Sequence, residues 1–188
     1  TSKIYAGDAF IRGGSNTTTH IIEEGQEVGT FYGWKCLGLD SDGKYIMQQA
    51  DPNNLIPEDR TYIGSAQPKL SYGLTNSLTY KKIDFSFFLR GVYGNDVLNY
   101  SRMSYATTQW LPGANVLKEA LTGGMNDNPK YCSFYIEKGS FMRLDNASLG
   151  YNFDTKNYWD IEKLRLSFTV QNLFVITRYK GLDPEVDM

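Results

Sequence analysis

The sequence predicts an all-β, antiparallel fold in which each long strand has one apolar and one polar face. Apolar and polar side chains alternate along residues 146–153 and 164–171, and again along 70–80 and 83–90. Successive side chains of a β-strand point to opposite faces of the sheet, so each stretch predicts an amphipathic strand. Transmembrane β-barrels and soluble β-sandwiches both contain such strands, and the alternation alone fits either.

One contact separates these two architectures. In a sandwich, Leu166 and Phe168 pack against apolar residues of a second sheet about 10 Å away. In a barrel, the same side chains face lipid and are exposed within the chain itself. The predicted strands are about as long as the tilted strands of roughly 9–11 residues that cross a bilayer.

Residues 1–27 are weakly patterned. We expect the end of a strand at residues 3–11, followed by a polar loop that contains His20, the single histidine. A single histidine provides too few imidazole ligands for most histidine metal sites and too few groups for most histidine acid–base mechanisms. We therefore expect His20 to be a solvated loop residue.

Residues 62–93 predict a hairpin of two long amphipathic strands with a tight turn at Lys81 and Lys82. Asn76 interrupts the apolar face of the first strand, and Phe88 interrupts the polar face of the second. The apolar side chains are Leu70, Tyr72, Leu74, Leu78 and Tyr80, followed by Ile83, Phe85, Phe87 and Leu89.

Two long irregular segments, around residues 40–62 and 95–138, predict loops, with a short helix expected at 114–121. Loops of this length are usually functional or disordered. Aromatic residues are enriched at protein interfaces. For the aromatic side chains of the second loop we therefore favour contact with a partner over contact with a ligand. These candidates are Tyr100, Tyr105, Trp110 and Tyr131.

Composition excludes several classes of function. The net charge is −2, and acidic and basic residues are mixed along the chain. The sequence therefore lacks the cluster of basic residues that binds nucleic acid. No nucleophile elbow, phosphate-cradling glycine loop or metal-spaced cluster occurs, and we expect no catalytic residue, no metal and no cofactor. Cys36 and Cys132 match no metal or redox spacing. We expect two incidental thiols, with a disulfide as the alternative in an exported protein.

Residues 139–186 contain two long motifs, GSF-x-RL-x-N-x-SLGY and QNLF-x-x-T-x-Y-x-G-x-DPE. The residues of the first are Gly139, Ser140, Phe141, Arg143, Leu144, Asn146, Ser148, Leu149, Gly150 and Tyr151. The residues of the second are Gln171, Asn172, Leu173, Phe174, Thr177, Tyr179, Gly181, Asp183, Pro184 and Glu185. Together they closely resemble the C-terminal part of the SusC/RagA family, and weaker matches extend the resemblance over most of residues 25–186.

Members of this family are TonB-dependent outer-membrane transporters of Gram-negative bacteria. They import glycans or oligopeptides together with a SusD-like surface lipoprotein. The resemblance implies that residues 1–188 are the C-terminal part of a transmembrane antiparallel β-barrel of 22 strands with a plugged lumen. It implies no enzyme activity. The partners implied are the plug and remaining strands of the same transporter, the lipid bilayer, the SusD-like lipoprotein, the glycan or peptide substrate, and the TonB complex through segments outside this chain.

Family members continue past the DPE segment into a last strand, so the resemblance implies that this strand is missing here and that the chain is an internal fragment. If the turn at Lys81 and Lys82 lies in the periplasm, strand direction puts the loops around 40–62 and 95–138 outside the cell. The connection at 154–163 then returns to the periplasm. The alternative, a soluble β-sandwich that binds glycans or serves as an adhesin module, stays open.

In a barrel the polar strand faces line the lumen. The lumen-facing candidates are Arg90, Asp84, Arg165 and Gln171. A charge on the lipid face near mid-membrane costs roughly 2–4 kcal/mol, so the alternation is energetically enforced. We expect the arginines to pair with neighbouring carboxylates such as Asp84.

Many family members carry an acidic, calcium-like loop near residues 40–60. Calcium needs several converging oxygen ligands and a glycine that turns the chain. Asp51, Asn53 and Asp59 are present here, but the central Asp-Gly pair is missing, and Asp42–Gly43 lies too early to replace it. We therefore expect a solvated acidic loop without a metal.

Overall fold

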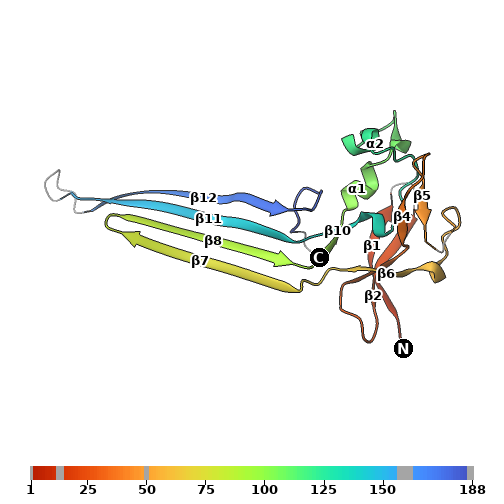
Figure 1. Cartoon of the computed structure of the whole chain (residues 1–188), viewed down its shortest axis with the longest axis horizontal. Coiled ribbons are helices and arrows are strands. Elements are labelled where there is room, and N and C mark those ends of the chain that lie inside the picture. The colour runs from red at the N-terminus through yellow and green to blue at the C-terminus, as the bar shows by residue number, and fades with distance from the viewer. Residues whose placement is uncertain (1, 12–14, 49–50, 156–162, 186–188) are drawn as a thin grey trace. The chain divides into compact units, whose positions relative to one another are not determined.

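The structure is a computed structural model that describes residues 2–11, 15–48, 51–155 and 163–185. The chain divides into two compact units (Figure 1). The sheet unit comprises residues 69–93 and 140–178, and the loop unit comprises residues 1–68, 94–139 and 179–188. Residues 156–162, within the connection predicted between the last two strands, lie outside the described residues.

The sheet unit is one four-stranded antiparallel sheet with the order β12-β11-β8-β7. Its strands are β7 (Leu70–Tyr80), β8 (Ile83–Tyr93), β11 (Phe141–Phe153) and β12 (Leu164–Thr177). All four predicted strands are therefore confirmed. The predicted tight turn is confirmed as well, because the last residue of β7 pairs with the first residue of β8.

A β-bulge interrupts the register of β11 between Leu144 and Asn146. Strict alternation would put Asp145 on the apolar face of the sheet. The extra residue instead puts Leu144 opposite Leu89 on that face. The Asp145 carboxylate accepts a hydrogen bond from Nε of Arg90 at 2.5 Å. The bulge therefore keeps a charge off the apolar face, which is consistent with the local re-aiming of side chains that bulges provide.

The loop unit contains a four-stranded antiparallel sheet with the order β1-β2-β3-β6. Its strands are β1 (Ile4–Ile11), β2 (Ser15–Ile22), β3 (Thr30–Gly33) and β6 (Thr61–Ser65). The prediction that His20 is a solvated loop residue is wrong. His20 belongs to β2, is half-buried, and stacks on Phe31 with ring centroids 4.5 Å apart.

The remaining elements of the loop unit are short, and most lie in the segment predicted as the loop 95–138. Helix α2 overlaps the second half of the helix expected at 114–121. These elements are β4 (Cys36–Leu39), β5 (Tyr45–Met47), η1 (Pro57–Asp59), β9 (Asp96–Leu98), α1 (Tyr100–Tyr105), η2 (Thr108–Trp110), α2 (Lys118–Thr122), η3 (Ser133–Tyr135) and β10 (Ile136–Lys138). Among the described residues, no helix is long and apolar enough to cross a membrane.

The core of the loop unit joins the two segments that the sequence predicts as separate loops. The hydroxyl oxygens of Tyr45 and Tyr135 lie 2.5 Å apart, in a buried hydrogen bond. The backbone N–H of Asn126 donates to the carbonyl of Gly43 at 2.9 Å, and a Cβ on Gly43 would lie 1.7 Å from the carbonyl oxygen of Gly124. The β4–β5 turn is thus held against residues 124–126. The buried cluster consists of Ala9, Tyr45, Met47, Met103, Met125, Tyr131, Cys132 and Tyr135.

Candidate functional site

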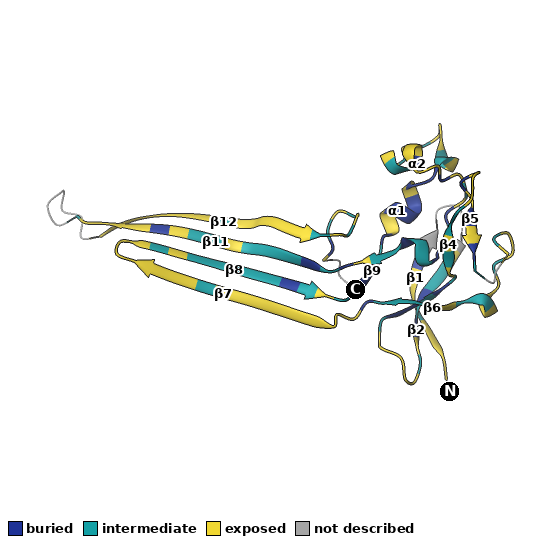
Figure 2. Cartoon of the chain, in the orientation of Figure 1, coloured by how far each residue is buried: buried dark blue, intermediate teal, exposed yellow. Residues whose placement is uncertain are grey.

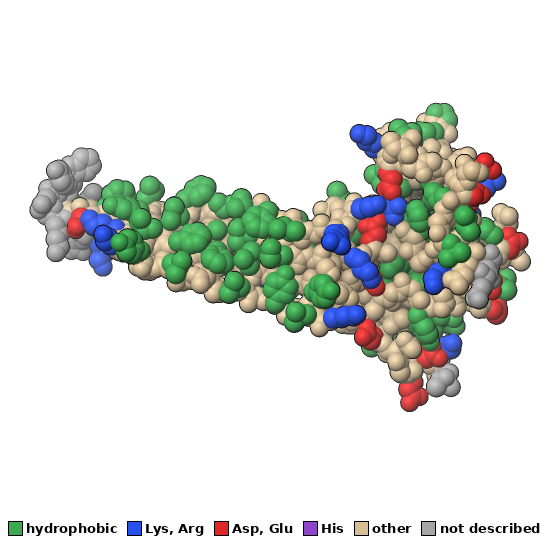
Figure 3. All heavy atoms as spheres, in the orientation of Figure 1, with side chains coloured by type: hydrophobic (Ala, Val, Ile, Leu, Met, Phe, Trp, Pro, Cys, Tyr) green, Lys and Arg blue, Asp and Glu red, His purple; other side chains and the backbone are tan. Residues whose placement is uncertain are grey.

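The apolar face of the sheet unit is uncovered within the described chain. Leu166 and Phe168 are 67% and 69% exposed, and Leu149 and Leu164 are also exposed, whereas Phe87 is half-buried. Figure 3 shows hydrophobic side chains gathered over this sheet, and Figure 2 shows its outer strands β7 and β12 as mostly exposed. The contacts with a second sheet that a sandwich requires of Leu166 and Phe168 are therefore absent among the described residues.

The face is built from rows of side chains that cross all four strands. Directly paired residues of adjacent strands point to the same side of a sheet. One row runs from Leu78 through Phe85 and Leu149 to Phe168. Asn76, which the sequence marks as the polar exception, pairs with Phe87 on the same face. The register of strand pairing therefore aligns these side chains in rows, and no second layer of the chain is needed to align them.

Tyrosines stand near both ends of this apolar face. Tyr80 and Tyr151 lie near the β7–β8 turn, and Tyr72 and Tyr93 lie toward the opposite end of the strands. All four side chains are exposed, by 39% or more. Aromatic rings at two heights with aliphatic side chains between them are typical of strands that cross a bilayer.

The strand lengths match a bilayer. β7 and β8 each have 11 residues. At about 3.4 Å per residue such a strand spans about 37 Å, and a tilt of about 40° gives a height of about 28 Å. The apolar band of an outer-membrane barrel is about 25 Å tall. The geometry of the sheet unit therefore suits a membrane wall.

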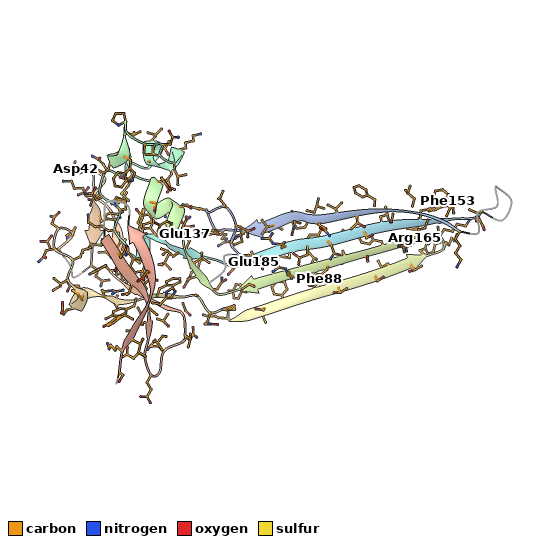
Figure 4. All side chains as sticks on the ribbon, turned by 180° about the vertical axis from the view of Figure 1, so that it is seen from behind. Asp42, Phe88, Glu137, Phe153, Arg165 and Glu185 are labelled. Carbon is orange, nitrogen blue, oxygen red and sulfur yellow. The ribbon has the colours of Figure 1, made fainter. Side chains whose placement is uncertain are left out.

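The opposite face is polar, and ion pairs lie on it. Arg165 on β12 donates from Nη2 to Asp84 on β8 at 2.5 Å, across the intervening strand β11. Gly150 of β11 lies beneath this pair, and a Cβ there would come within 2.5 Å of the Asp84 carboxylate. Figure 4 labels Arg165 on this sheet. The glycine of the SLGY motif thus leaves room for an ion pair that spans three strands.

Arg90 pairs with Asp145 and not with the expected Asp84, because the bulge brings Asp145 to the polar face. Gln171 is exposed and pairs with Asn146 on that face. The four residues predicted to face a lumen thus all lie on the polar side of the sheet. That this side lines a lumen stays a prediction.

Phe88 is an aromatic side chain on the polar face (Figure 4). Its ring lies over Gly73 of β7, where a Cβ would lie 3.3 Å from the ring carbon. On the apolar face the Tyr72 ring lies over Gly91 in the same way, 2.4 Å from the position of a Cβ. In each case a glycine without a side chain accommodates an aromatic ring from the neighbouring strand.

The four aromatic candidates of the segment 95–138 have different surroundings. Tyr100 and Tyr105 are 41% and 42% exposed, and both belong to α1. Trp110 is half-buried and donates from Nε1 to the carbonyl of Ser104 at 2.9 Å. Tyr131 is fully buried and donates its hydroxyl to a backbone carbonyl of β2 at 2.7 Å. As a correction, Tyr131 is a core residue of this structure and is not presented to a partner.

Sequence reasoning missed two arginines that organise the loop unit. Arg102 on α1 is buried, with hydrogen bonds of 2.7–3.0 Å to Glu119 and of 3.2 Å to Glu137. Arg60 lies 5.0 Å from the ring centroid of Tyr32 and donates to its carbonyl oxygen. Both are structural anchors, which a single sequence does not reveal because their carboxylate and aromatic partners lie far away along the chain.

A pocket of about 460 Å³ opens in the loop unit between β1, β2 and β9. Its lining includes Asp8, His20 and Tyr100. Burial lowers the pKa of His20, so its ring is neutral at neutral pH.

Among the described residues, no group of three or more histidine, cysteine or acidic side chains is arranged to hold a metal ion. The acidic turn around Asp42 is instead held by hydrogen bonds within the turn, because Asp40 Oδ1 accepts from the Asp42 and Lys44 amides.

No model of a known protein family matches the chain. Individual proteins do. The chain is 34% identical over 200 residues to the TonB-dependent receptor SusC of Bacteroides thetaiotaomicron, an alignment that covers 97% of the chain and 19% of that receptor. It is 30% identical over 196 residues to the TonB-dependent receptor P3 of Formosa agariphila, with 90% of the chain and 20% of that receptor covered. The chain thus spans about a fifth of the length of these curated relatives.

Solved structures agree in fold. The RagAB peptide importer in its open-open state matches 94% of this chain with a TM-score of 0.66 at 20% identity, over 21% of the matching chain. Another structure of the RagAB peptide transporter matches 82% of this chain with a TM-score of 0.64. The predicted resemblance is therefore confirmed, and the antiparallel β-architecture is that of a portion of such a receptor. The chain belongs to the SusC/RagA family of TonB-dependent receptors.

Proposed function

We propose that this chain forms part of the wall and outer loops of an importer in the outer membrane of a Gram-negative bacterium. The importer takes up glycans or oligopeptides with a SusD-like lipoprotein and draws on the TonB complex through segments outside this chain. It is a transporter and not an enzyme. Support comes from the relatives, which are TonB-dependent receptors, and from the fold shared with the RagAB peptide importer.

One observation carries the proposal. Four long strands form a single layer whose apolar side chains are exposed, with Leu166 and Phe168 at 67% and 69%. In water, so large a continuous apolar face is unfavourable, and in monomeric soluble proteins contiguous apolar patches of this extent are rare. Lipid removes that penalty. The edge strands β7 and β12 then pair with further strands, because open sheet edges do not occur in the hydrocarbon region.

On this proposal the polar face lines the lumen of a large plugged barrel with 22 strands. Asp84, Arg90, Arg165 and Gln171 then contact lumen water. The ion pairs with Asp84 and Asp145 reduce the net charge that this part of the wall presents to the plug or to a passing substrate. They also hold the arginine side chains against the wall, because each guanidinium is tied to a carboxylate of the same sheet.

The loop unit corresponds to the outer loops around residues 40–62 and 95–138. We place Tyr100, Tyr105 and Trp110 at the contact with the SusD-like lipoprotein. The two exposed tyrosines of α1 support this assignment, since exposed aromatic side chains are enriched at protein interfaces. Tyr131 is left out of the contact set because it is buried.

Site-directed labelling of the complete transporter in outer-membrane vesicles tests whether β12 is part of the membrane wall. Leu166→Cys and Ser167→Cys are adjacent on β12 and point to opposite faces, so each is the matched control of the other. Both are made in a background with Cys36→Ala and Cys132→Ala. A charged, water-soluble maleimide is expected to label Ser167→Cys and to spare Leu166→Cys, whereas a spin label at 166 is expected to contact lipid-dissolved relaxation agents. Equal labelling of the two positions would refute the proposal that β12 is part of a membrane wall.

Purification from the bacterium's own membrane tests whether the transporter binds a SusD-like lipoprotein. Affinity-tagged transporter, extracted in mild detergent, is expected to bring down one lipoprotein in near-equal amount. Tyr100→Ala combined with Tyr105→Ala is expected to lower that yield. Leu182→Ala, which alters a fully exposed side chain elsewhere in the loop unit, serves as the control. Recovery of the transporter alone from wild-type membranes would argue against a lipoprotein partner.

A further inference from the structure

The two cysteines meet in the loop unit although the sequence separates them widely. Cys36 begins β4, and Cys132 immediately precedes η3. Trp34 and Cys132 form an isolated parallel bridge, and the Ser133 amide donates to the Trp34 carbonyl at 2.9 Å. The Cys36 amide donates to the Ser133 hydroxyl at 2.9 Å, across 97 positions of sequence. Backbone contacts on both sides thus fix the two cysteines beside each other.

Both side chains also belong to the same packed region, because Cys36 packs against the core cluster that contains Cys132. The Cys36 thiol donates to the carbonyl of Gly38 at 3.2 Å. Cys132 is fully buried in the core cluster, whereas Cys36 is half-buried at its margin. The neighbouring Cys132 thiol lowers the pKa of Cys36 to about 7, and the neighbouring Cys36 thiol, together with burial, raises the pKa of Cys132. Cys36 is therefore the reactive member of the pair.

We propose that Cys36 and Cys132 form an intrachain disulfide once the chain has been exported, which links β4 to the segment before η3. The structure has both as free thiols. The proposal depends on the proposed outer-membrane location only for access to an oxidising compartment, where disulfides form and persist. The placement of the two cysteines beside each other is a property of the loop unit itself.

The chemistry needs a disulfide donor, either a protein with an oxidising dithiol or a small-molecule disulfide. The Cys36 thiolate attacks one sulfur of the donor, the donor S–S bond breaks, and the released donor thiolate takes up a proton. The Cys132 thiol then loses its proton and its sulfur attacks the Cys36 sulfur of the mixed disulfide, which expels the second donor thiolate. In total the two protein thiols lose two electrons and two protons, and the donor disulfide gains them.

A disulfide here closes a loop that contains most of the loop unit. Cross-links that close long loops restrict the unfolded chain most strongly in the chain-entropy account. The bond would therefore hold the two outer-loop segments, 40–62 and 95–138, together on the cell surface. Reduction is expected to speed cleavage within residues 95–138 by an added protease by about tenfold or more.

The test uses the complete wild-type transporter, denatured directly from outer membranes in excess N-ethylmaleimide and then digested without reduction. We expect a linked peptide pair that contains Cys36 and Cys132, with neither residue alkylated until a reductant is added. The Cys36→Ser variant is the control, because its Cys132 must then be alkylated. Alkylation of both cysteines in wild-type protein from the outer membrane would overturn the proposal.

A second arm separates this inference from the proposed function. If the protein is not found in the outer membrane, the proposed function fails, and purified protein is then treated with oxidised glutathione. Formation of the Cys36–Cys132 link under those conditions supports the pairing independently of location. Glutathione adducts or free thiols without the link overturn it.

Discussion

A charge placed in the middle of β12 tests the orientation of the wall most directly. Val170 lies midway along β12 on the apolar face, and Gln171 is its neighbour on the polar face. An arginine on the lipid face near the bilayer midplane costs about 2–4 kcal/mol, and the cost falls to about 0–1 kcal/mol near the interfaces. Val170→Arg is therefore expected to lower the folding equilibrium constant by about 30- to 700-fold.

Two further variants make the measurement specific. On the proposed orientation, Gln171→Arg puts the same charge into lumen water, and Leu164→Arg puts it at the end of the strand near the interface. Both are expected to lose less than about 1 kcal/mol. A soluble sandwich would also penalise a charge at Val170, but it offers no reason for the loss to follow depth in a bilayer.

The assay is denaturant unfolding of the complete transporter in lipid vesicles, followed by the mobility of the folded barrel on unheated gels. The amount of protein inserted in the outer membrane provides a second reading. The proposed orientation of β12 is refuted if the unfolding free energies of Val170→Arg and Gln171→Arg differ by less than about 0.5 kcal/mol. It is also refuted if Gln171→Arg is the more damaging of the two, because the polar face would then be the one in contact with lipid.

Four further predictions concern individual side-chain interactions, each measured by thermal or denaturant unfolding. Tyr131→Phe removes the buried hydrogen bond to β2 and is expected to cost the loop unit about 1 kcal/mol. Arg102→Ala removes the buried guanidinium that pairs with the half-buried Glu119 and Glu137 carboxylates and is expected to cost about 3 kcal/mol, whereas no loss would show that the network is dispensable. The Arg102 hydrogen bond lowers the pKa of Glu119 below its ordinary value of 4.5, so the pair stabilises fully above pH 4.5. Below that pH the stabilisation declines, and Glu119→Gln should remove this acid dependence. On the polar face, Arg165→Gln is expected to cost less than about 1 kcal/mol because the pair is exposed.

The sheet unit was largely predictable because its information is local. Alternation with a period of two specifies a strand and its two faces without knowledge of any partner. The hairpin turn at Lys81 and Lys82 follows from the same alternation on both sides. The bulge at Asp145 was not predicted, since an extra residue is visible only against the register of a neighbouring strand. The exchange of Asp84 for Asp145 as the partner of Arg90 is a direct consequence.

The loop unit was less predictable because its contacts are long-range. His20 lies in a Thr-rich polar stretch that reads as a loop, yet strand pairing with β1 and stacking on Phe31 bury half of it. Tyr131 reads as an exposed loop aromatic and is a core residue. The loops 40–62 and 95–138 read as separate segments, and only the folded chain brings them together.

The sequence by itself determined the strands, their two faces and, through two long motifs, the family. Those properties depend on the spacing of neighbouring residues, which a linear sequence contains in full. Only the tertiary structure decided that Leu166 and Phe168 remain exposed, that an ion pair crosses Gly150, and that Cys36 lies beside Cys132. Each of these depends on which distant segments approach one another, and that is set by register and packing rather than by any local pattern.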